Sequence, residues 1–356
     1  MLGDAMSLTV GLAMTVSLAT LFRLFQKHID GRPLLEYEPR KPAPWNVLAP
    51  LVMLAPLAFA LSSTLSAGPQ YDATAETTAL SATAAAGAVG APPAAWFGSS
   101  AAAAPVLHLT RRMADAGSTT GRIWASAAMT LMLAACSYLL LTIAFGAKPH
   151  DLGLPRNWRQ ACGDVKIGAV AWAASLVPIF AILLVLNEIF KPTEGHPLIE
   201  NLMVDHSFGM MSAAAFTAVV AAPLYEETAF RLVFQGWLER REMLARCVRT
   251  LAIPSQSTLP AANADAAVGA IEGESRVVSE TVAYSPVGWA PVAISGVLFG
   301  LAHFGHGVAP TPLILLGVVL GYLYRQTHRV LPCIVCHMLF NAFTFVLLAL
   351  QFAAMG

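Results

Sequence analysis

The chain has 356 residues, of which 56% are hydrophobic and 12% are charged, and its formal net charge is zero. A soluble domain carries about 25% charged residues, so this composition excludes an ordinary soluble protein and indicates an integral membrane protein. The zero net charge provides no general attraction to nucleic acid, and we predict no nucleic-acid partner.

Apolar stretches long enough to cross a bilayer define the predicted elements, because a spanning helix needs roughly 20 mostly apolar residues. The sequence predicts an all-α fold, a polytopic transmembrane helical bundle of about eight spans. In chain order, the expected spans are residues 5–25, 46–63, 122–145, 165–186, 210–237, 287–304, 311–325 and 331–352. No basic segment precedes the first apolar run, so we expect this run to be a retained membrane anchor.

Two long stretches interrupt the apolar pattern. Residues 64–118 are rich in Ala, but Gly and Pro residues break any helix there, so we expect a long low-complexity loop. Residues 241–285 are polar and show no periodicity, and we expect a second loop. The chain is therefore divided into N-terminal transmembrane helices, residues 1–200, and a second helical domain, residues 210–352, into which the polar loop is inserted.

The distribution of Lys and Arg predicts the orientation in the membrane. The loops after the first, third, fifth and seventh expected spans carry most of these residues, whereas the loops between them carry few. Because cytoplasmic loops are enriched in Lys and Arg, this alternation places both termini outside the cytoplasm. We expect an integral protein of the bacterial inner, or cytoplasmic, membrane.

Two adjacent glutamates, Glu226 and Glu227, lie in the middle of an apolar stretch of membrane length, with Arg231 shortly after them. A charged side chain at the bilayer centre costs about 2.5–3.5 kcal/mol on insertion scales, so these residues indicate a functional site. Glu227 and Arg231 are spaced i,i+4 and can form an ion pair. Glu226 is turned about 100° away and is free to act as a general base or acid. The alternative is a buried ion pair that joins helices, which leaves Glu226 without a role.

Polar residues also occur in two later expected spans. His303 ends the run Phe299-Gly-Leu-Ala-His303, and taken alone it fits a hydrogen-bonded packing residue as well as a catalytic one. His337 and Asn341 are spaced i,i+4 on one helix face, and a histidine with an amide donor can stabilise an oxyanion. The alternative for this second pair is an interhelical hydrogen bond that serves packing.

Three short motifs thus follow one another along the chain, each within an expected span: Glu226-Glu227-x-x-x-Arg231, Phe299-x-x-x-His303 and His337-x-x-x-Asn341. Together they resemble the CPBP family of intramembrane proteases, which includes CAAX prenyl endopeptidases and bacteriocin-processing or lysostaphin-resistance-like immunity proteins. The resemblance covers residues 210–350. It implies a helical membrane protease whose active site opens from a cavity within the bilayer.

The resemblance also implies six catalytic residues: Glu226, Glu227, Arg231, His303, His337 and Asn341. Glu226 would activate a water molecule with the help of His303. The His–Asn pair would stabilise the tetrahedral oxyanion, and the Glu–Arg pair would hold these groups in place. The implied reaction is hydrolysis of peptide bonds in membrane-associated proteins or peptides, so the expected partners are such a substrate and the lipid bilayer. The oligomeric state is left open.

Members of this family are often called metalloproteases, which raises the question of a cofactor. Glu226, His303 and His337 offer three ligands for a zinc ion and leave one position for water. However, the chain has no H-E-x-x-H helix, and a glutamate-activated water needs no metal. We therefore favour a mechanism that requires no cofactor, with zinc as the alternative.

A non-catalytic protein is the main functional alternative. A transporter, or an immunity or scaffold protein with the same fold, would use the Glu and His residues as a proton relay. A protease needs its catalytic residues around one point, whereas a relay would distribute them along a path across the membrane. The positions of these side chains therefore discriminate between the two functions.

Two further patterns occur near the C-terminus. Cys333-Ile-Val-Cys336-His337 matches the haem-attachment pattern C-x-x-C-H, but the predicted orientation puts it on the cytoplasmic side, where such attachment does not occur. Gly317-Val-Val-Leu-Gly321 predicts close packing against a neighbouring helix, with a dimer contact as the weaker alternative.

Overall fold

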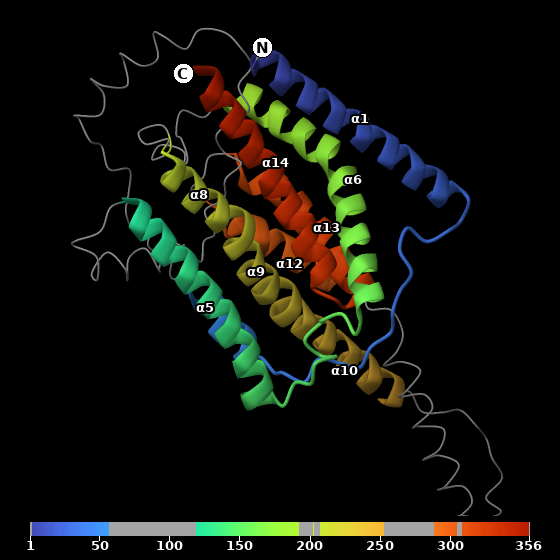
Figure 1. Cartoon of the computed structure of the whole chain (residues 1–356). Helices are drawn as coiled ribbons and strands as arrows, with labels where there is room; N and C mark the ends of the chain where they lie inside the picture. Colours follow the sequence, from blue (N-terminus) through green and yellow to red (C-terminus); the bar gives the residue numbers. More distant parts are fainter. Residues whose placement is uncertain are drawn as a thin grey trace, which may run out of the picture.

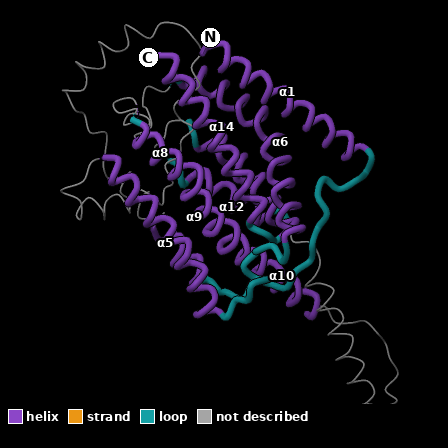
Figure 2. The backbone as a smooth tube through the Cα atoms, in the orientation of Figure 1, coloured by secondary structure: helices purple, strands orange, loops and turns teal. Residues whose placement is uncertain are grey.

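The computed structural model describes residues 2–56, 119–191, 202, 207–252, 288–304 and 308–355. The regular secondary structure of these residues is helical, without a strand (Figure 2). Five segments are long and apolar enough to cross a membrane: Asp4–Ile29 in α1 (Leu2–Ile29), α5 (Thr119–Phe145), α6 (Trp158–Phe190), Phe208–Val248, and Leu331–Ala354 in α14 (Leu331–Met355). The predicted all-α transmembrane bundle is confirmed.

The other expected spans are short or only partly described. α12 (Ala290–Leu301) is an apolar helix of 12 residues, and α13 (Pro310–Thr327) has 18 residues with polar side chains near its C-terminal end. The expected span 46–63 is described to residue 56, and its residues 48–56 are helical. The expected loop 64–118 lies outside the described residues. By length and composition, the structure supports five of the expected spans, and the count of eight stays a prediction.

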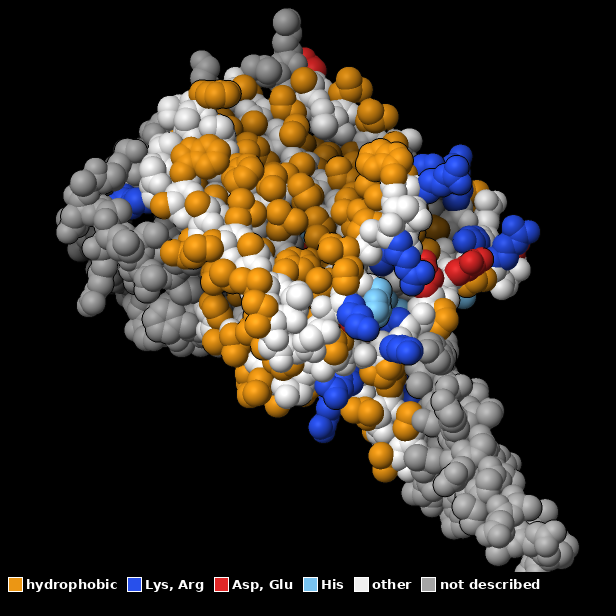
Figure 3. Space-filling view, turned by 60° about the horizontal axis from the view of Figure 1, so that its bottom comes forward, with side chains coloured by type: hydrophobic (Ala, Val, Ile, Leu, Met, Phe, Trp, Pro, Cys, Tyr) orange, Lys and Arg blue, Asp and Glu red, His pale blue; other side chains and the backbone are white. Residues whose placement is uncertain are grey.

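The two ends of the chain lie at the same end of the bundle (Figure 1). The connections that follow α1 and α5 meet the α13–α14 connection at the opposite end, where Glu38 N donates to Gln326 O at 2.7 Å and Val330 N to Gly153 O at 3.0 Å. Figure 3, with this end turned forward, shows Lys and Arg side chains gathered beside a broad apolar surface. Termini at one end fit an even number of crossings, and the compartment that they face stays a prediction.

Residues 208–252 form one long helical segment, which we call the glutamate helix. It consists of five consecutive pieces: α8 (Phe208–Phe216), η2 (Thr217–Ala221), α9 (Ala222–Glu227), η3 (Thr228–Gln235) and α10 (Gly236–Ala252). η2 and η3 are π-helical, so the two glutamates lie in a short α-helical piece between two widened stretches. π-helical turns are rare and occur frequently at functional sites.

The glutamate helix continues further than the sequence predicted. The polar loop was expected to begin at residue 241, but α10 extends to Ala252. The correction has a local cause, because this stretch is rich in good helix formers and Glu242 pairs with Arg246 at i,i+4 spacing. The prediction relied on polarity alone and therefore assigned the last part of this helix to a loop. The rest of the expected loop, up to residue 285, includes residues 253–285, which lie outside the described part of the chain.

α14 occupies the centre of the bundle, in contact with α1, α6, α13 and the glutamate helix, while α5 packs on the other side of that helix (Figure 1). α12 and α13 form a close helical hairpin. A Cβ atom added to Gly317 would lie 2.7 Å from the Gly296 carbonyl oxygen, so only glycine permits this approach. The close packing predicted from the Gly317–Gly321 motif is confirmed.

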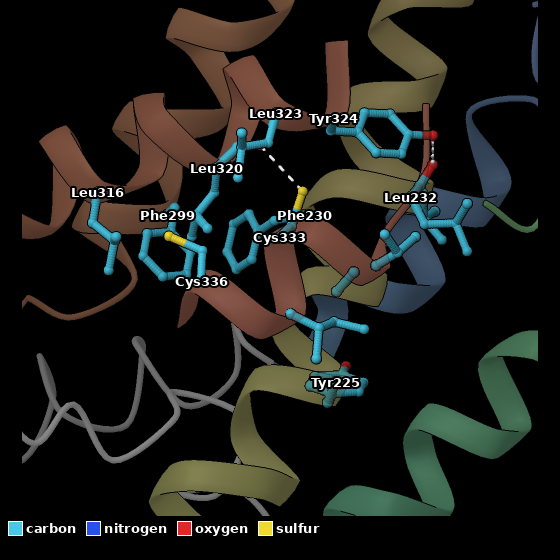
Figure 4. Close-up of a cluster of buried hydrophobic side chains, with 14 of the residues drawn as sticks. Tyr225, Phe230, Leu232, Phe299, Leu316, Leu320, Leu323, Tyr324, Cys333 and Cys336 are labelled. Carbon is cyan, nitrogen blue, oxygen red and sulfur yellow. Dashed lines mark hydrogen bonds between the residues drawn. The ribbon is translucent and has the colours of Figure 1, made fainter. Parts of the chain in front are cut away.

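An apolar core joins α12, α13 and α14 to the glutamate helix. Figure 4 draws some of its buried side chains and labels Tyr225, Phe230, Leu232, Phe299, Leu316, Leu320, Leu323, Tyr324, Cys333 and Cys336. Both cysteines are 0% exposed, and the Cys333 thiol donates to the Leu320 carbonyl at 3.3 Å. Thiols enclosed in this core have no room beside them for a haem group, so this pattern serves packing.

Candidate active site

The ion pair expected from the first motif is present. Arg231 Nε lies 3.1 Å from Glu227 Oε2, and both side chains are 0% exposed. Arg231 Nη1 also donates to Ser295 Oγ at 2.7 Å, and the guanidinium lies 4.9 Å from the centre of the Phe299 ring. One arginine therefore neutralises Glu227 and attaches the glutamate helix to α12.

His337 of α14 lies between the two glutamates. Its Nδ1 is 2.9 Å from Glu227 Oε1, and its Nε2 is 3.9 Å from Glu226 Oε2. Glu227 thus has a partner for each oxygen, Arg231 on one side and His337 on the other. A carboxylate accepts hydrogen bonds, so Nδ1 carries the proton in this contact and Nε2 faces Glu226. Glu227 therefore keeps a proton on Nδ1 and fixes the direction of the imidazole.

Glu226 has a different environment from its neighbour. Its side chain is nearly as buried, at 2% exposure, yet Oε1 has no hydrogen-bond partner among the described residues. The 3.9 Å between Oε2 and His337 Nε2 is too long for a direct hydrogen bond. A buried carboxylate without partners is unfavourable, and contacts of this length are commonly bridged by water. The site therefore provides one spare carboxylate beside an imidazole nitrogen.

The Phe299 ring forms a wall shared by both histidines. Its centre lies 5.2 Å from the ring of His303 and 5.5 Å from the ring of His337. His303 is 3% exposed, and its Nδ1 lies 2.9 Å from the Phe299 carbonyl. This backbone contact leaves Nε2 as the ring nitrogen directed away from the helix. The second motif is thus held beside the first and third.

Asn341 contacts the backbone of the glutamate helix. Its Nδ2 donates to the Ala218 carbonyl at 2.7 Å. In η2, the Ala222 N–H bonds to Thr217, and Pro223 has no N–H to offer. The Ala218 carbonyl therefore lacks its helical donor, and the Asn341 amide replaces it. This N–H is used within the protein, so the expected oxyanion role would fall to the other N–H of the amide.

The expected zinc ligands do not form a ligand set in the structure. Among the residues that are described, no three His, Cys, Asp or Glu side chains are arranged to hold a metal ion. Glu226, His303 and His337 are included in this statement. The mechanism without a cofactor, with zinc as the alternative, stays a prediction.

Ser295 is a site residue that the sequence did not reveal. Its hydroxyl accepts from Arg231 and donates to the Phe230 carbonyl at 3.2 Å. It is the only hydroxyl side chain within α12 and is 0% exposed. A single serine in an apolar helix produces no periodic pattern. The only signal in the sequence was that Ser295 is a lone polar residue within an apolar stretch.

A family model described as type II CAAX prenyl endopeptidase Rce1-like matches residues 276–343. The matched stretch contains the second and third motifs and excludes the glutamate pair of the first. The resemblance to the CAAX-type intramembrane proteases inferred from the motifs is confirmed, because this stretch of the chain is similar to that family. No curated protein and no solved structure matches the chain.

Proposed function

We propose that this protein is an intramembrane endopeptidase that hydrolyses peptide bonds of membrane-associated proteins or peptides with a water activated by Glu226. The observation that carries the proposal is the buried Glu226 carboxylate, whose Oε1 has no hydrogen-bond partner among the described residues and whose Oε2 faces His337 Nε2 at 3.9 Å. General-base catalysis needs such a carboxylate, within reach of a water and not already engaged by a cation.

In this mechanism the water lies between Glu226 and His337. The Glu226 carboxylate takes a proton as the water oxygen attacks the carbonyl carbon of the substrate. The carbonyl oxygen becomes an oxyanion, which Asn341 and His337 stabilise as hydrogen-bond donors. For this role His337 is an imidazolium, which keeps one N–H on Glu227 and offers the Nε2–H to the oxyanion. Glu226 then returns the proton to the leaving amine as the C–N bond breaks, and His303 assists these transfers.

Glu227 and Arg231 act on this chemistry through His337. The carboxylate of Glu227 holds the imidazole, and Arg231 supplies the compensating charge that makes a second buried carboxylate tolerable. The three motifs around one point also favour a protease over a proton relay. Both glutamates contact a single imidazole, whereas a relay needs successive groups across the membrane.

The test is a comparison of membrane-associated protein termini in cells that make the wild-type protein or the Glu226→Gln variant. Termini present only with the wild type are the expected result, because Gln keeps the shape of Glu but cannot accept the proton. Glu239→Gln is the matched control, since Glu239 is a buried glutamate of the same helix outside the site. Identical termini in wild-type and Glu226→Gln cells would overturn the proposal.

A further inference from the structure

The carbonyl groups of η3 receive hydrogen bonds from three separate parts of the chain. Ser295 Oγ donates to Phe230 O at 3.2 Å, Tyr324 Oη to Leu232 O at 3.4 Å, and Trp45 Nε1 to Val233 O at 3.0 Å. The Tyr324 contact is visible in Figure 4. A π-helical stretch disturbs the regular α-helical ladder, and buried carbonyls need donors. Side chains outside the glutamate helix therefore stabilise its unusual register.

Trp45 differs from the other two donors in its origin. It belongs to the connection after α1, far in sequence from the matched residues 276–343, and it is 0% exposed. Its backbone carbonyl accepts from Arg240 Nη1 at 2.6 Å, while its indole N–H binds Val233. Trp45 thus joins η3 and α10 across their boundary.

The packing at this boundary is tight around Gly236. A Cβ atom added to Gly236, the first residue of α10, would lie 3.2 Å from Trp45 Cζ2 and 3.1 Å from Tyr324 Oη. The absence of a side chain at Gly236 lets the indole reach the carbonyl of Val233. The hydrogen bond from Trp45 to Val233 therefore depends on the small residue at Gly236.

The same N-terminal segment touches the glutamate helix on the other side of the site. Tyr225, directly before Glu226, donates its hydroxyl proton to the Met53 carbonyl at 2.7 Å. Contacts at Tyr225 and at Val233 enclose the stretch that carries Glu226, Glu227 and Arg231. Residues 45–53 thus bind the glutamate helix on both sides of the stretch that carries the first motif.

We propose that Trp45 is a positioning residue for the hydrolysis proposed above. Its indole N–H holds η3 in the π-helical register, and this register directs Arg231 to Ser295 of α12. Arg231 in the same position pairs with Glu227, which in turn holds His337. A shift of one residue in helical register turns a side chain by about 100°, so loss of the bond at Val233 would misdirect Arg231. The inference rests on the proposed function for its catalytic consequence, but not for the structural effect on η3.

The first test measures kcat and KM of Trp45→Phe on a substrate found by the terminus comparison. Phe keeps an aromatic ring in the core and removes the N–H donor. We expect kcat to fall about tenfold or more and KM to change less than about twofold, because misplaced catalytic groups lose rate while substrate contacts persist. Trp172→Phe is the matched control: Trp172 packs against Phe343, and its indole N–H has no partner among the described residues.

The second test needs no substrate and uses the full-length protein in lipid nanodiscs. Hydrogen–deuterium exchange of the amides in η3 is expected to increase in Trp45→Phe and to remain unchanged in Trp172→Phe. If no protein is cleaved even by the wild type, the proposed function fails while this exchange result still decides the role of Trp45 in η3. Unchanged exchange in η3, or a rise spread over all helices with kcat preserved, would overturn the inference.

Discussion

In two places along the described glutamate helix a buried histidine lies against a glutamate, and the comparison between these places separates proposed catalysis from structural support. In the first, Glu227 Oε1 meets His337 Nδ1 at 2.9 Å. In the second, Glu239 Oε2 lies 3.3 Å from His328 Nε2, at ion-pair distance but without the direction of a good hydrogen bond, and both side chains are almost fully buried. The composition of the two contacts is alike, and their surroundings differ.

The surroundings of the second contact are structural. Gln235 Nε2 donates to Glu239 Oε1 at 3.0 Å, and His328 Nδ1 lies 2.8 Å from the carbonyl of Glu38. This contact ties the connection after α1 to the glutamate helix, and within the described part of the chain no second carboxylate is at ion-pair distance from the imidazole. The first contact has Glu226 beside it as a spare carboxylate. In the proposed mechanism this further acid–base group, Glu226, distinguishes the catalytic Glu–His pair from the supporting one.

The largest expected effect is that of Glu226→Gln on the turnover of a substrate by the purified protein. General-base catalysis contributes about 10²–10⁴-fold, so turnover should fall by a factor in this range while the protein still inserts and folds. Glu239→Gln provides the comparison, because it changes the same residue type on the same helix. Turnover near that of the wild type in Glu226→Gln would contradict the assignment of the base.

His337→Ala should have the next largest effect on turnover. Removal of one oxyanion donor costs about 10²–10³ in rate, and His337 also orients toward the Glu226 carboxylate. The measurement is kcat of His337→Ala beside kcat of His328→Ala, the histidine of the second contact. If the two variants lose the same activity, the distinction between the two contacts is wrong.

Arg231→Ala should reduce stability as well as activity. Breaking a buried pair leaves Glu227 uncompensated and typically costs about 3–5 kcal/mol in the free energy of unfolding. The double variant Arg231→Ala with Glu227→Gln should recover much of this loss, because the unpaired charge is then absent. Thermal unfolding of both variants in the same detergent measures the effect. A double variant that melts no higher than Arg231→Ala would show that the two residues are not energetically coupled.

The sequence predicted those parts of the site that depend on local geometry. The Glu227–Arg231 pair follows from i,i+4 spacing, and that spacing holds across the boundary of η3. The contact between Glu227 and His337 joins residues 110 positions apart, and no periodicity within one helix contains it. The order of the three motifs indicated one site, but the distances within it had to come from the packing of α14 against the glutamate helix.

The π-helical register illustrates why the rest could not be predicted. The residues of η3 are ordinary helix formers, and nothing in their order indicates a widened turn. Their register depends on donors such as Trp45 and Tyr324, which are supplied by remote segments. The helix that continues to Ala252 is a different case, because its helix-forming residues and the i,i+4 spacing of Glu242 and Arg246 were present in the sequence and only its polarity suggested a loop. The hydrogen-bond register of η3 depends on tertiary contacts, and the composition of the segment predicts only that it is buried.

Glu239→Gln should have a smaller effect, restricted to stability. The contact with His328 loses its charge, and buried polar groups with weakened partners cost about 1–3 kcal/mol. We expect a lower melting temperature with kcat and KM near those of the wild type, because Glu239 has no contact with the spare carboxylate. A loss of kcat in Glu239→Gln that approaches the loss in Glu226→Gln would remove the distinction between support and chemistry.

Treatment with a strong metal chelator should have the smallest effect, leaving turnover unchanged. The side chains of the site do not form a metal-binding group, and a carboxylate that serves as a base needs no ion beside it. The measurement is turnover before and after chelation, together with the zinc content of the wild type, Glu226→Gln and Glu239→Gln. A base at Glu226 predicts the same zinc content in all three proteins. A ligand at Glu226 predicts about one equivalent of zinc in the wild type and in Glu239→Gln, and its loss from Glu226→Gln. Zinc that leaves and returns in parallel with activity would therefore contradict the assignment of Glu226 as a base that works without a metal.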